Sequence, residues 1–201
     1  MQERANHLLT FHFFFLRKLF FVKEADALVL CPGGFGTLDE AWEVLTLIQT
    51  GKSPLVPIVL LDVEGGTYWD KSLAFMREEM SDKGYILPED LELMRLVRTP
   101  EEAGQEIARF YSNYHSTRWY SGNFVIRTNH RLNADALAHL NQNYADICTS
   151  GGFSQVKYCP ETHREPEFCN LHRHEFAFNA RDIGRLRQMV DYINQPENWE
   201  R

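Results

Sequence analysis

The first half of the chain alternates short apolar runs with longer segments whose apolar residues recur every three or four positions. Short apolar runs typical of buried parallel strands occur at 27–31 and 57–62, with a weaker third at 96–98. The helical period predicts helices at 7–24, 38–50, 68–82 and 100–114. Strands that alternate with helices predict an α/β fold, a parallel sheet with helices on both faces.

The first predicted helix, 7–24, is apolar on every face, so we expect it to be buried on more than one side. Its apolar stretch is too short to span a membrane, and Arg17 and Lys18 interrupt it. These cations could extend to a nearby surface, but the apolar residues on both sides leave little surface to reach. A cation in such surroundings usually has an anionic partner, either a carboxylate or a ligand phosphate.

The second half has a different pattern. It predicts strands at 123–128, 153–158 and 172–178, and helices at 133–146 and 180–194. Charge changes as well, because residues 1–114 hold 11 basic and 18 acidic residues, whereas residues 115–201 hold 10 of each and six of the eight histidines. We therefore predict two units, 1–114 and a small α+β unit at 115–201, with a boundary near 114–122.

Composition narrows the class of protein. Of the 201 residues, 44% are hydrophobic and 24% charged, which excludes a disordered or fibrous chain. The net charge of −7 excludes a general basic surface for nucleic acid, so an anionic ligand has to be held by a local binding site. Four cysteines are too few for a disulfide scaffold, and reduced thiols indicate a cytoplasmic protein.

The segment 32–37, Pro-Gly-Gly-Phe-Gly-Thr, joins a predicted strand to a predicted helix. Ligands of open parallel sheets bind at the carboxyl ends of the strands, and the glycines Gly33, Gly34 and Gly36 permit close approach to the backbone. The N–H groups of residues 38–40 and the helix dipole favour an anion such as phosphate. A tight turn without a ligand is the alternative.

Residues 37–40 also match a capping box, in which Thr37 caps the helix and Glu40 folds back onto the cap N–H. That structural role is the default for an isolated T-x-x-E pattern. A functional carboxylate at Glu40 is the alternative, and the pattern does not separate the two.

Two clusters in the second half carry further candidate chemistry. Five potential zinc ligands lie within 16 residues, at Cys159, His163, Cys169, His172 and His174. Their spacing fits no standard finger, so a solvated loop followed by an ordinary strand is the leading interpretation. The arginines of the last helix, Arg181, Arg185 and Arg187, are expected on a solvated face.

Arg17-Lys18, followed by P-G-G-F-G-T-L-D-E at 32–40, resembles the LOG (Lonely Guy) family, once mislabelled as lysine decarboxylases. The hallmark of that family is an Arg-Lys pair followed by P-G-G-x-G-T-x-x-E, and the separation of the two motifs is also similar. The resemblance covers about residues 7–111. Residues 115–201 look like a carboxyl-terminal extension of some longer bacterial members.

The resemblance implies a Rossmann-like domain and a phosphoribohydrolase. Such an enzyme cleaves the N-glycosidic bond of a nucleoside 5′-monophosphate, either AMP or the N6-substituted AMP of cytokinin activation. The family's catalytic pair maps onto Arg17 and Glu40, and its phosphate loop onto Gly33, Gly34, Gly36 and Thr37, with Lys18 as a further phosphate ligand. It implies a homodimer without metal or organic cofactor, and no pyridoxal-type context favours a decarboxylase. A non-catalytic nucleotide-binding protein is the alternative.

The family domain is larger than the part seen here, because its amino-terminal half contributes early strands and a second glycine-rich segment. Three strands leave a parallel edge unpaired, and an all-apolar helix is ill suited to solvent. We therefore expect either a fragment of a longer protein or an obligate oligomer that covers residues 8–22, with weak activity in the isolated chain.

Overall fold

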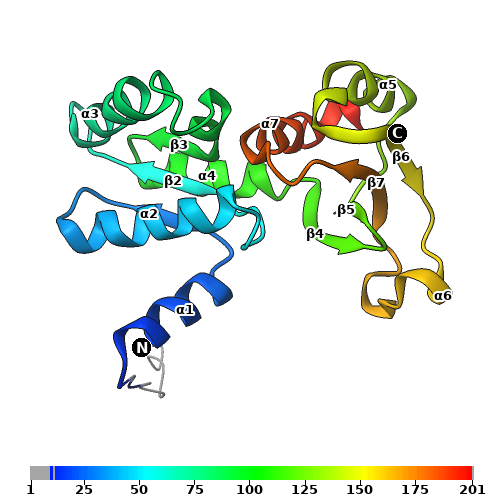
Figure 1. Cartoon of the computed structure of the whole chain (residues 1–201), viewed down its shortest axis with the longest axis horizontal. Coiled ribbons are helices and arrows are strands. Elements are labelled where there is room, and N and C mark those ends of the chain that lie inside the picture. The colour runs from blue at the N-terminus through cyan, green and yellow to red at the C-terminus, as the bar shows by residue number, and fades with distance from the viewer. Residues whose placement is uncertain (1–9, 11, 201) are drawn as a thin grey trace.

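The computed structural model describes residue 10 and residues 12–200, which form two separate β-sheets with helices around them (Figure 1). The first sheet is parallel and comes from the first half of the chain. The second is antiparallel and comes from the second half. The mixed α/β class predicted from the sequence is therefore confirmed.

The parallel sheet has the strand order β1-β2-β3, with β1 at Leu28–Leu30, β2 at Ile58–Leu61 and β3 at Met94–Val97. Its helices are α2 (Phe35–Gln49), α3 (Tyr68–Phe75) and α4 (Pro100–Phe110). A π-helical segment, Met76–Ser81, prolongs α3. The chain then turns at Gly84, whose φ of +76° suits glycine and explains the predicted stop.

The antiparallel sheet has the order β4-β5-β7-β6. Its strands are β4 (Tyr114–Tyr120), β5 (Asn123–Thr128), β6 (Cys148–Val156) and β7 (His172–Phe178), and its main helices are α5 (Ala134–Asn143) and α7 (Ile183–Ile193). Strand β4 was not predicted, because we assigned 114–122 to a boundary. Ser121 and Gly122, both with positive φ, instead turn β4 directly into β5 as a hairpin.

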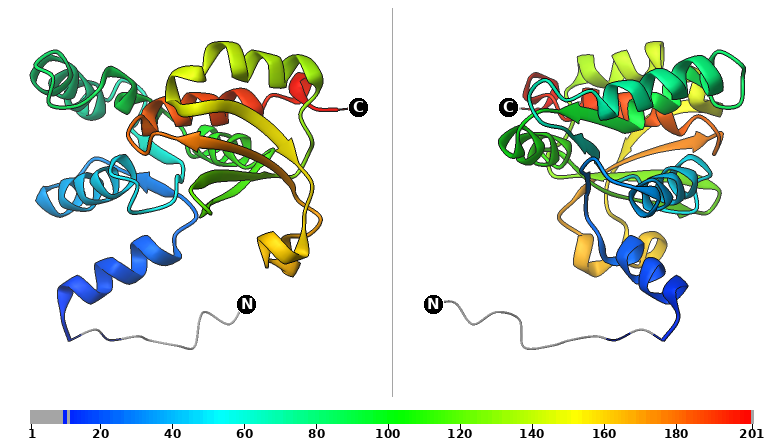
Figure 2. Two further views of the ribbon diagram at one scale, coloured as in Figure 1. Left: turned by 45° about the vertical axis from the view of Figure 1, so that its right-hand side comes forward. Right: turned by 90° about the vertical axis from the view of Figure 1, so that its left-hand side faces the viewer.

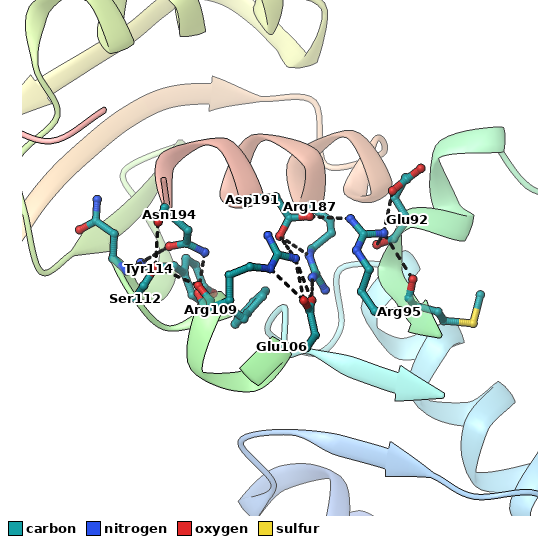
Figure 3. A network of polar contacts seen from close by, with 12 residues as sticks. Glu92, Arg95, Glu106, Arg109, Ser112, Tyr114, Arg187, Asp191 and Asn194 are labelled. Atoms are coloured by element: carbon teal, nitrogen blue, oxygen red, sulfur yellow. Dashed lines mark hydrogen bonds and ion pairs between the residues drawn. The ribbon is translucent and has the colours of Figure 1, made fainter. Parts of the chain in front are cut away.

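Helix α7 connects the second sheet to the first through a polar network (Figure 3). Arg187 is fully buried and donates to Glu106 of α4 at 2.6 Å and to Asp191 at 3.2 Å. Arg95 of β3 reaches Asp191 at 2.7 Å. The prediction that Arg187 lies on a solvated face is therefore wrong, because carboxylates from both halves of the chain compensate its burial.

The buried side chains of the two halves form one continuous core that includes residues of both sheets. Asn194, just after α7, donates to the Phe110 carbonyl at 2.6 Å and accepts from the Tyr114 N–H at 2.7 Å. Close packing reinforces this, since a Cβ on Gly184 would lie 2.1 Å from the Glu89 carbonyl oxygen. The division into units at 1–114 and 115–201 stays a prediction, now with a shared core between them.

Helix α1 (Phe14–Glu24) projects away from the parallel sheet in all views (Figures 1 and 2). Phe15, Leu19 and Phe21 are 59–64% exposed, while Val22 packs against the core. The prediction that this helix is buried on more than one side is wrong for this structure, because only its carboxyl-terminal turn reaches the core. Positions 7–9 and 11 of the predicted helix lie outside the described residues.

None of the helices in the described part of the chain combines the length and the apolar character that a membrane crossing requires.

Candidate active site

The glycine-rich loop lies between β1 and α2, at the carboxyl end of the parallel strands, as predicted. Helix α2 begins at Phe35 rather than at residue 38, because Gly34 takes the extended N-cap conformation. The prediction that the N–H groups of residues 38–40 are available to an anion is therefore wrong. Leu38, for example, donates its N–H to the Gly34 carbonyl at 3.3 Å. The first turn instead presents the N–H groups of Phe35 and Gly36, which have no acceptor within the helix.

The capping box predicted for Thr37 and Glu40 is absent from the described structure. The N-cap is Gly34, which has no side chain, and no side chain caps the amino end of α2. Thr37 is the third residue of the helix, and Glu40 lies almost one turn farther along, with 26% of its side chain exposed. The capping role that was the alternative to a functional role for Glu40 is therefore excluded.

The three glycines of the loop differ in their surroundings. A Cβ on Gly33 would lie 2.1 Å from Thr37 Oγ1, so close packing explains that glycine. A Cβ on Gly34 or Gly36 would meet nothing within 4 Å. Space beside these two positions allows a ligand to approach the backbone at the positive end of the helix dipole.

Arg17 and Glu40 line the same pocket, which has a volume of about 230 Å³. Apolar residues of α1, the start of β1, α2 and the segment before β2 form most of its wall. The Arg17 side chain is exposed, and its guanidinium carbon lies 5.6 Å from the centre of the Phe21 ring. The structure thus brings together the cation and the carboxylate of the predicted catalytic pair. The predicted phosphate-loop residues do not line this pocket.

Lys18 joins α1 to α2. Its buried ammonium makes an ion pair with Asp39, a second with Glu43 at 3.1 Å and a longer contact with Glu40 at 3.9 Å. The hydrogen bond to Asp39, followed by the contact with Glu43, raises the pKa of Lys18. A carboxylate partner was one of the two options that the apolar surroundings predicted. The phosphate-binding role of Lys18 stays a prediction.

Sequence reasoning missed a polar group at the carboxyl ends of β2 and β3. The buried carboxylate of Asp62 accepts the N–H groups of Tyr68 (3.0 Å) and Trp69 (3.3 Å) and so fixes the start of α3. Arg98 donates to Asp70 at 2.7 Å, and the Tyr68 hydroxyl donates to the Gly33 carbonyl at 2.7 Å. These contacts hold the β2–α3 loop against the glycine-rich loop. An aspartate directly after an apolar strand was the available signal.

The candidate zinc ligands of the second half are distributed among different contacts. His163 Nδ1 accepts the Cys159 N–H at 2.8 Å, and its Nε2 lies 3.2 Å from Glu175. His174 is buried, with Nε2 3.0 Å from the Thr128 hydroxyl. Within the described residues, no three histidine, cysteine or acidic side chains are grouped closely enough to hold a metal ion.

Comparison with known proteins identifies the family to which this chain is similar. A family model described as "Possible lysine decarboxylase" matches residues 1–107. Similar proteins include "Probable cytokinin riboside 5'-monophosphate phosphoribohydrolase LOG6" of Arabidopsis thaliana, 42% identical over 72 residues, which are 36% of this chain and 34% of that protein. "Cytokinin riboside 5'-monophosphate phosphoribohydrolase LOG3", also of Arabidopsis thaliana, is 33% identical over 94 residues, covering 47% of this chain and 42% of that protein.

"Probable cytokinin riboside 5'-monophosphate phosphoribohydrolase LOGL2" of Oryza sativa subsp. japonica is 33% identical over 94 residues, 47% of this chain and 37% of that protein. The chain therefore matches only 34–42% of the length of these three relatives. The family match, in contrast, extends over more than half of the chain and includes both the Arg17-Lys18 pair and the glycine-rich loop. The protein therefore belongs to this family of LOG-type proteins.

Proposed function

We propose that the protein hydrolyses the N-glycosidic bond of a nucleoside 5′-monophosphate, AMP or an N6-substituted AMP, to the free base and ribose 5-phosphate. The observation that carries the proposal is that Arg17 and Glu40, far apart in the sequence, line one pocket, and that Glu40 lies on the helix that begins at the glycine-rich loop. The names of the relatives support the same reaction class.

The chemistry of the pocket suits this reaction. As the base leaves, positive charge develops on the ribose, and a carboxylate at Glu40 stabilises that charge and orients the attacking water. Water supplies the hydroxyl group at the anomeric carbon, and its proton compensates the charge of the departing base. The Arg17 guanidinium can hold the 5′-phosphate or a ribose hydroxyl through its planar fork.

The glycine-rich loop has a separate role in the proposal. The N–H groups of Phe35 and Gly36, with the open space beside Gly34, form a cradle for a phosphate group. The loop does not line the Arg17–Glu40 pocket, so in this proposal the substrate extends from one to the other. A nucleoside monophosphate has its phosphate and its glycosidic bond at different ends of the ribose, as this arrangement requires.

A homodimer and a cytoplasmic location belong to the same proposal. The exposed apolar side chains of α1, at Phe15, Leu19 and Phe21, support a dimer because large exposed apolar patches usually mark an interface. Within the described residues no disulfide joins the four cysteines, which suits a reducing compartment.

Incubation with AMP and with N6-isopentenyl-AMP tests the reaction. Release of ribose 5-phosphate from either nucleotide is the expected result. Saturable binding of both nucleotides without release would favour the alternative, a non-catalytic nucleotide-binding protein. Comparing the two initial rates also identifies the preferred base.

A further inference from the structure

A second cavity, of about 310 Å³, lies where β6 ends and β7 begins, on the opposite side of the molecule from α1 (Figure 1). Three permanent cations line it: Arg131 from the β5–α5 connection, Lys157 just after β6, and Arg173 from β7. His172 lines it as well, and none of its described lining residues carries a carboxylate. A concentration of one sign of charge in a concave site attracts counter-ions.

Arg173 is a buried cation in the wall of this cavity. Its side chain is fully buried, and its two terminal nitrogens donate to the Leu171 and Phe168 carbonyls at 2.7 and 2.9 Å. The guanidinium also lies over the Tyr158 ring, 4.7 Å from its centre. Among the described atoms, its Nε has no hydrogen-bond partner. Arg173 therefore adds a fixed, buried positive charge to the wall of the cavity, while its two terminal nitrogens are already used by carbonyls.

The carboxylates near Arg173 do not balance the charge around it. Arg127 on β5 lies directly opposite Arg173 in the strand register, an arrangement that like charges disfavour. Among the described side chains, both arginines and Arg118 share one carboxylate, that of Glu165, which lies 3.4 Å from Arg127 and 3.9 Å from Arg173. Burial and the neighbouring arginines lower the pKa of Arg127, against the effect of Glu165. Among the described side chains, the arginines around Arg173 therefore outnumber their carboxylate partners.

The rim of the cavity carries further uncompensated charge. Arg131 has only a 3.5 Å contact with Glu200, and both side chains are about half exposed, so this pair is weak. Lys157 is exposed and makes no ion pair with any described carboxylate. Burial first, and then the charge of Arg131, lower the pKa of the His172 imidazole, although Glu200 opposes this. The imidazole therefore also experiences the positive potential.

We propose that this cavity is a second anion site, which binds the phosphoryl group of a small molecule, either inorganic phosphate or a phosphate monoester. The exposed guanidinium of Arg131 and the exposed ammonium of Lys157 offer separate attachment points for the oxygens of a phosphoryl group, and a guanidinium fork binds such groups in bidentate fashion. The buried charge of Arg173 adds to the positive potential of the cavity. The volume lies at the lower end of the range for small-molecule pockets, which favours a compact ligand. The site is independent of the proposed hydrolysis.

Isothermal titration calorimetry on the full chain, with inorganic phosphate and with ribose 5-phosphate, tests this site. The double variant Arg131→Gln/Lys157→Gln removes two rim cations and is expected to weaken binding at this site about tenfold or more. Arg181→Gln is the matched control, because its side chain is 77% exposed and does not line the cavity. It removes the same kind of charge and is expected to leave the affinity unchanged.

Gly36→Ala separates this site from the proposed phosphate cradle at the start of α2, since phosphate binding at the second cavity is expected to survive in that variant. The affinities of the two probes distinguish free phosphate from a monoester. The proposal is overturned if neither probe binds saturably, if the double variant binds as tightly as the wild type, or if Arg181→Gln weakens binding equally. Melting temperatures of all variants verify that the changes in affinity do not come from unfolding.

Discussion

Helix α1 and strand β7 differ in the kind of side chain that they bury. Helix α1 exposes Leu19 and Phe21, although both are large and apolar, whereas β7 buries Arg173 and His174, which are polar or charged. The sequence pattern identifies the type of both elements, although residues 10, 12 and 13 of the predicted helix lie outside α1. Burial depends on which partners the rest of the molecule supplies. Exposed apolar and buried polar side chains are therefore the informative departures from the pattern.

Truncation of one buried and one exposed leucine tests this contrast, and it has the largest expected effect on the free energy of unfolding. Leu140 of α5 is 1% exposed, and Leu140→Ala is expected to lower the free energy of unfolding by about 2–5 kcal/mol. Leu19→Ala on α1 is expected to change it by less than about 0.5 kcal/mol in the monomer. Chemical denaturation at several protein concentrations measures both. An equal loss in both variants under monomeric conditions would contradict the exposed position of α1.

The pH dependence of stability tests the burial of the polar side chains of β7. Burial, followed by the charge of His172, lowers the pKa of His174 from 6.5 to about 3. The unfolded state therefore binds the proton first as the pH falls, and the stability contributed by neutral His174 is lost below about pH 6.5. Between pH 7 and pH 5 this loss is about 2 kcal/mol.

The variant His174→Gln isolates that effect, because glutamine cannot titrate and can still share a hydrogen bond with Thr128. Denaturation curves at pH 7 and pH 5 are expected to show a smaller pH dependence for the variant than for the wild type. The same pH dependence in both proteins would mean that His174 is solvated.

Arg17→Lys tests whether the exposed surface of α1 has a functional role. Lysine keeps the charge but loses the planar fork, and with it at least one charge-assisted hydrogen bond to the substrate. We expect turnover to fall roughly tenfold or more, with an unchanged melting temperature. Initial rates of ribose 5-phosphate release measure the change. Wild-type rates in this variant would remove Arg17 from the site.

Gly36→Ala tests whether the glycine-rich loop is needed for a ligand or only for the turn. Gly36 lies inside α2 with open space at its Cβ position, so alanine is expected to stabilise the protein by about 0.5–1 kcal/mol. A methyl group at the phosphate cradle is also expected to raise the KM for AMP. Gly104→Ala in α4, another helical glycine with open space, is the control and is expected to stabilise without a change in KM. A common KM for both variants would favour the simple turn.

The sequence predicted the parallel sheet well because its strands are short apolar runs between helices with clear boundaries. Strand β7 of the antiparallel sheet was also predicted with its observed bounds, His172–Phe178. Strand β4 was missed because His115, Arg118 and other polar residues interrupt its pattern. The start of α2 was misplaced because the cap is a glycine, and T-x-x-E offered a more familiar signal three residues later.

Site residues were predictable only where a motif carried them. Arg17 and Glu40 came from the resemblance, and their position in one pocket depends on the packing of α1 on α2, which periodicity does not specify. The ion pair of Lys18 with Asp39 was foreseeable only as a need for some anion. The buried contacts of Arg187 and Arg173 were not foreseeable, because they depend on carbonyl and carboxylate groups brought together by the tertiary fold.

Two glutamates of α2 allow the most direct test of the central claim, that Glu40 acts as the reacting carboxylate. Glu40 and Glu43 both contact Lys18, but only Glu40 lines the pocket with Arg17. We expect Glu40→Gln to lower the rate of ribose 5-phosphate release from AMP by on the order of a hundredfold or more, at an unchanged melting temperature. Glu43→Gln is expected to retain near-wild-type rates. Equal rates in the two variants, or a melting temperature that falls together with the activity of Glu40→Gln, would contradict the claim.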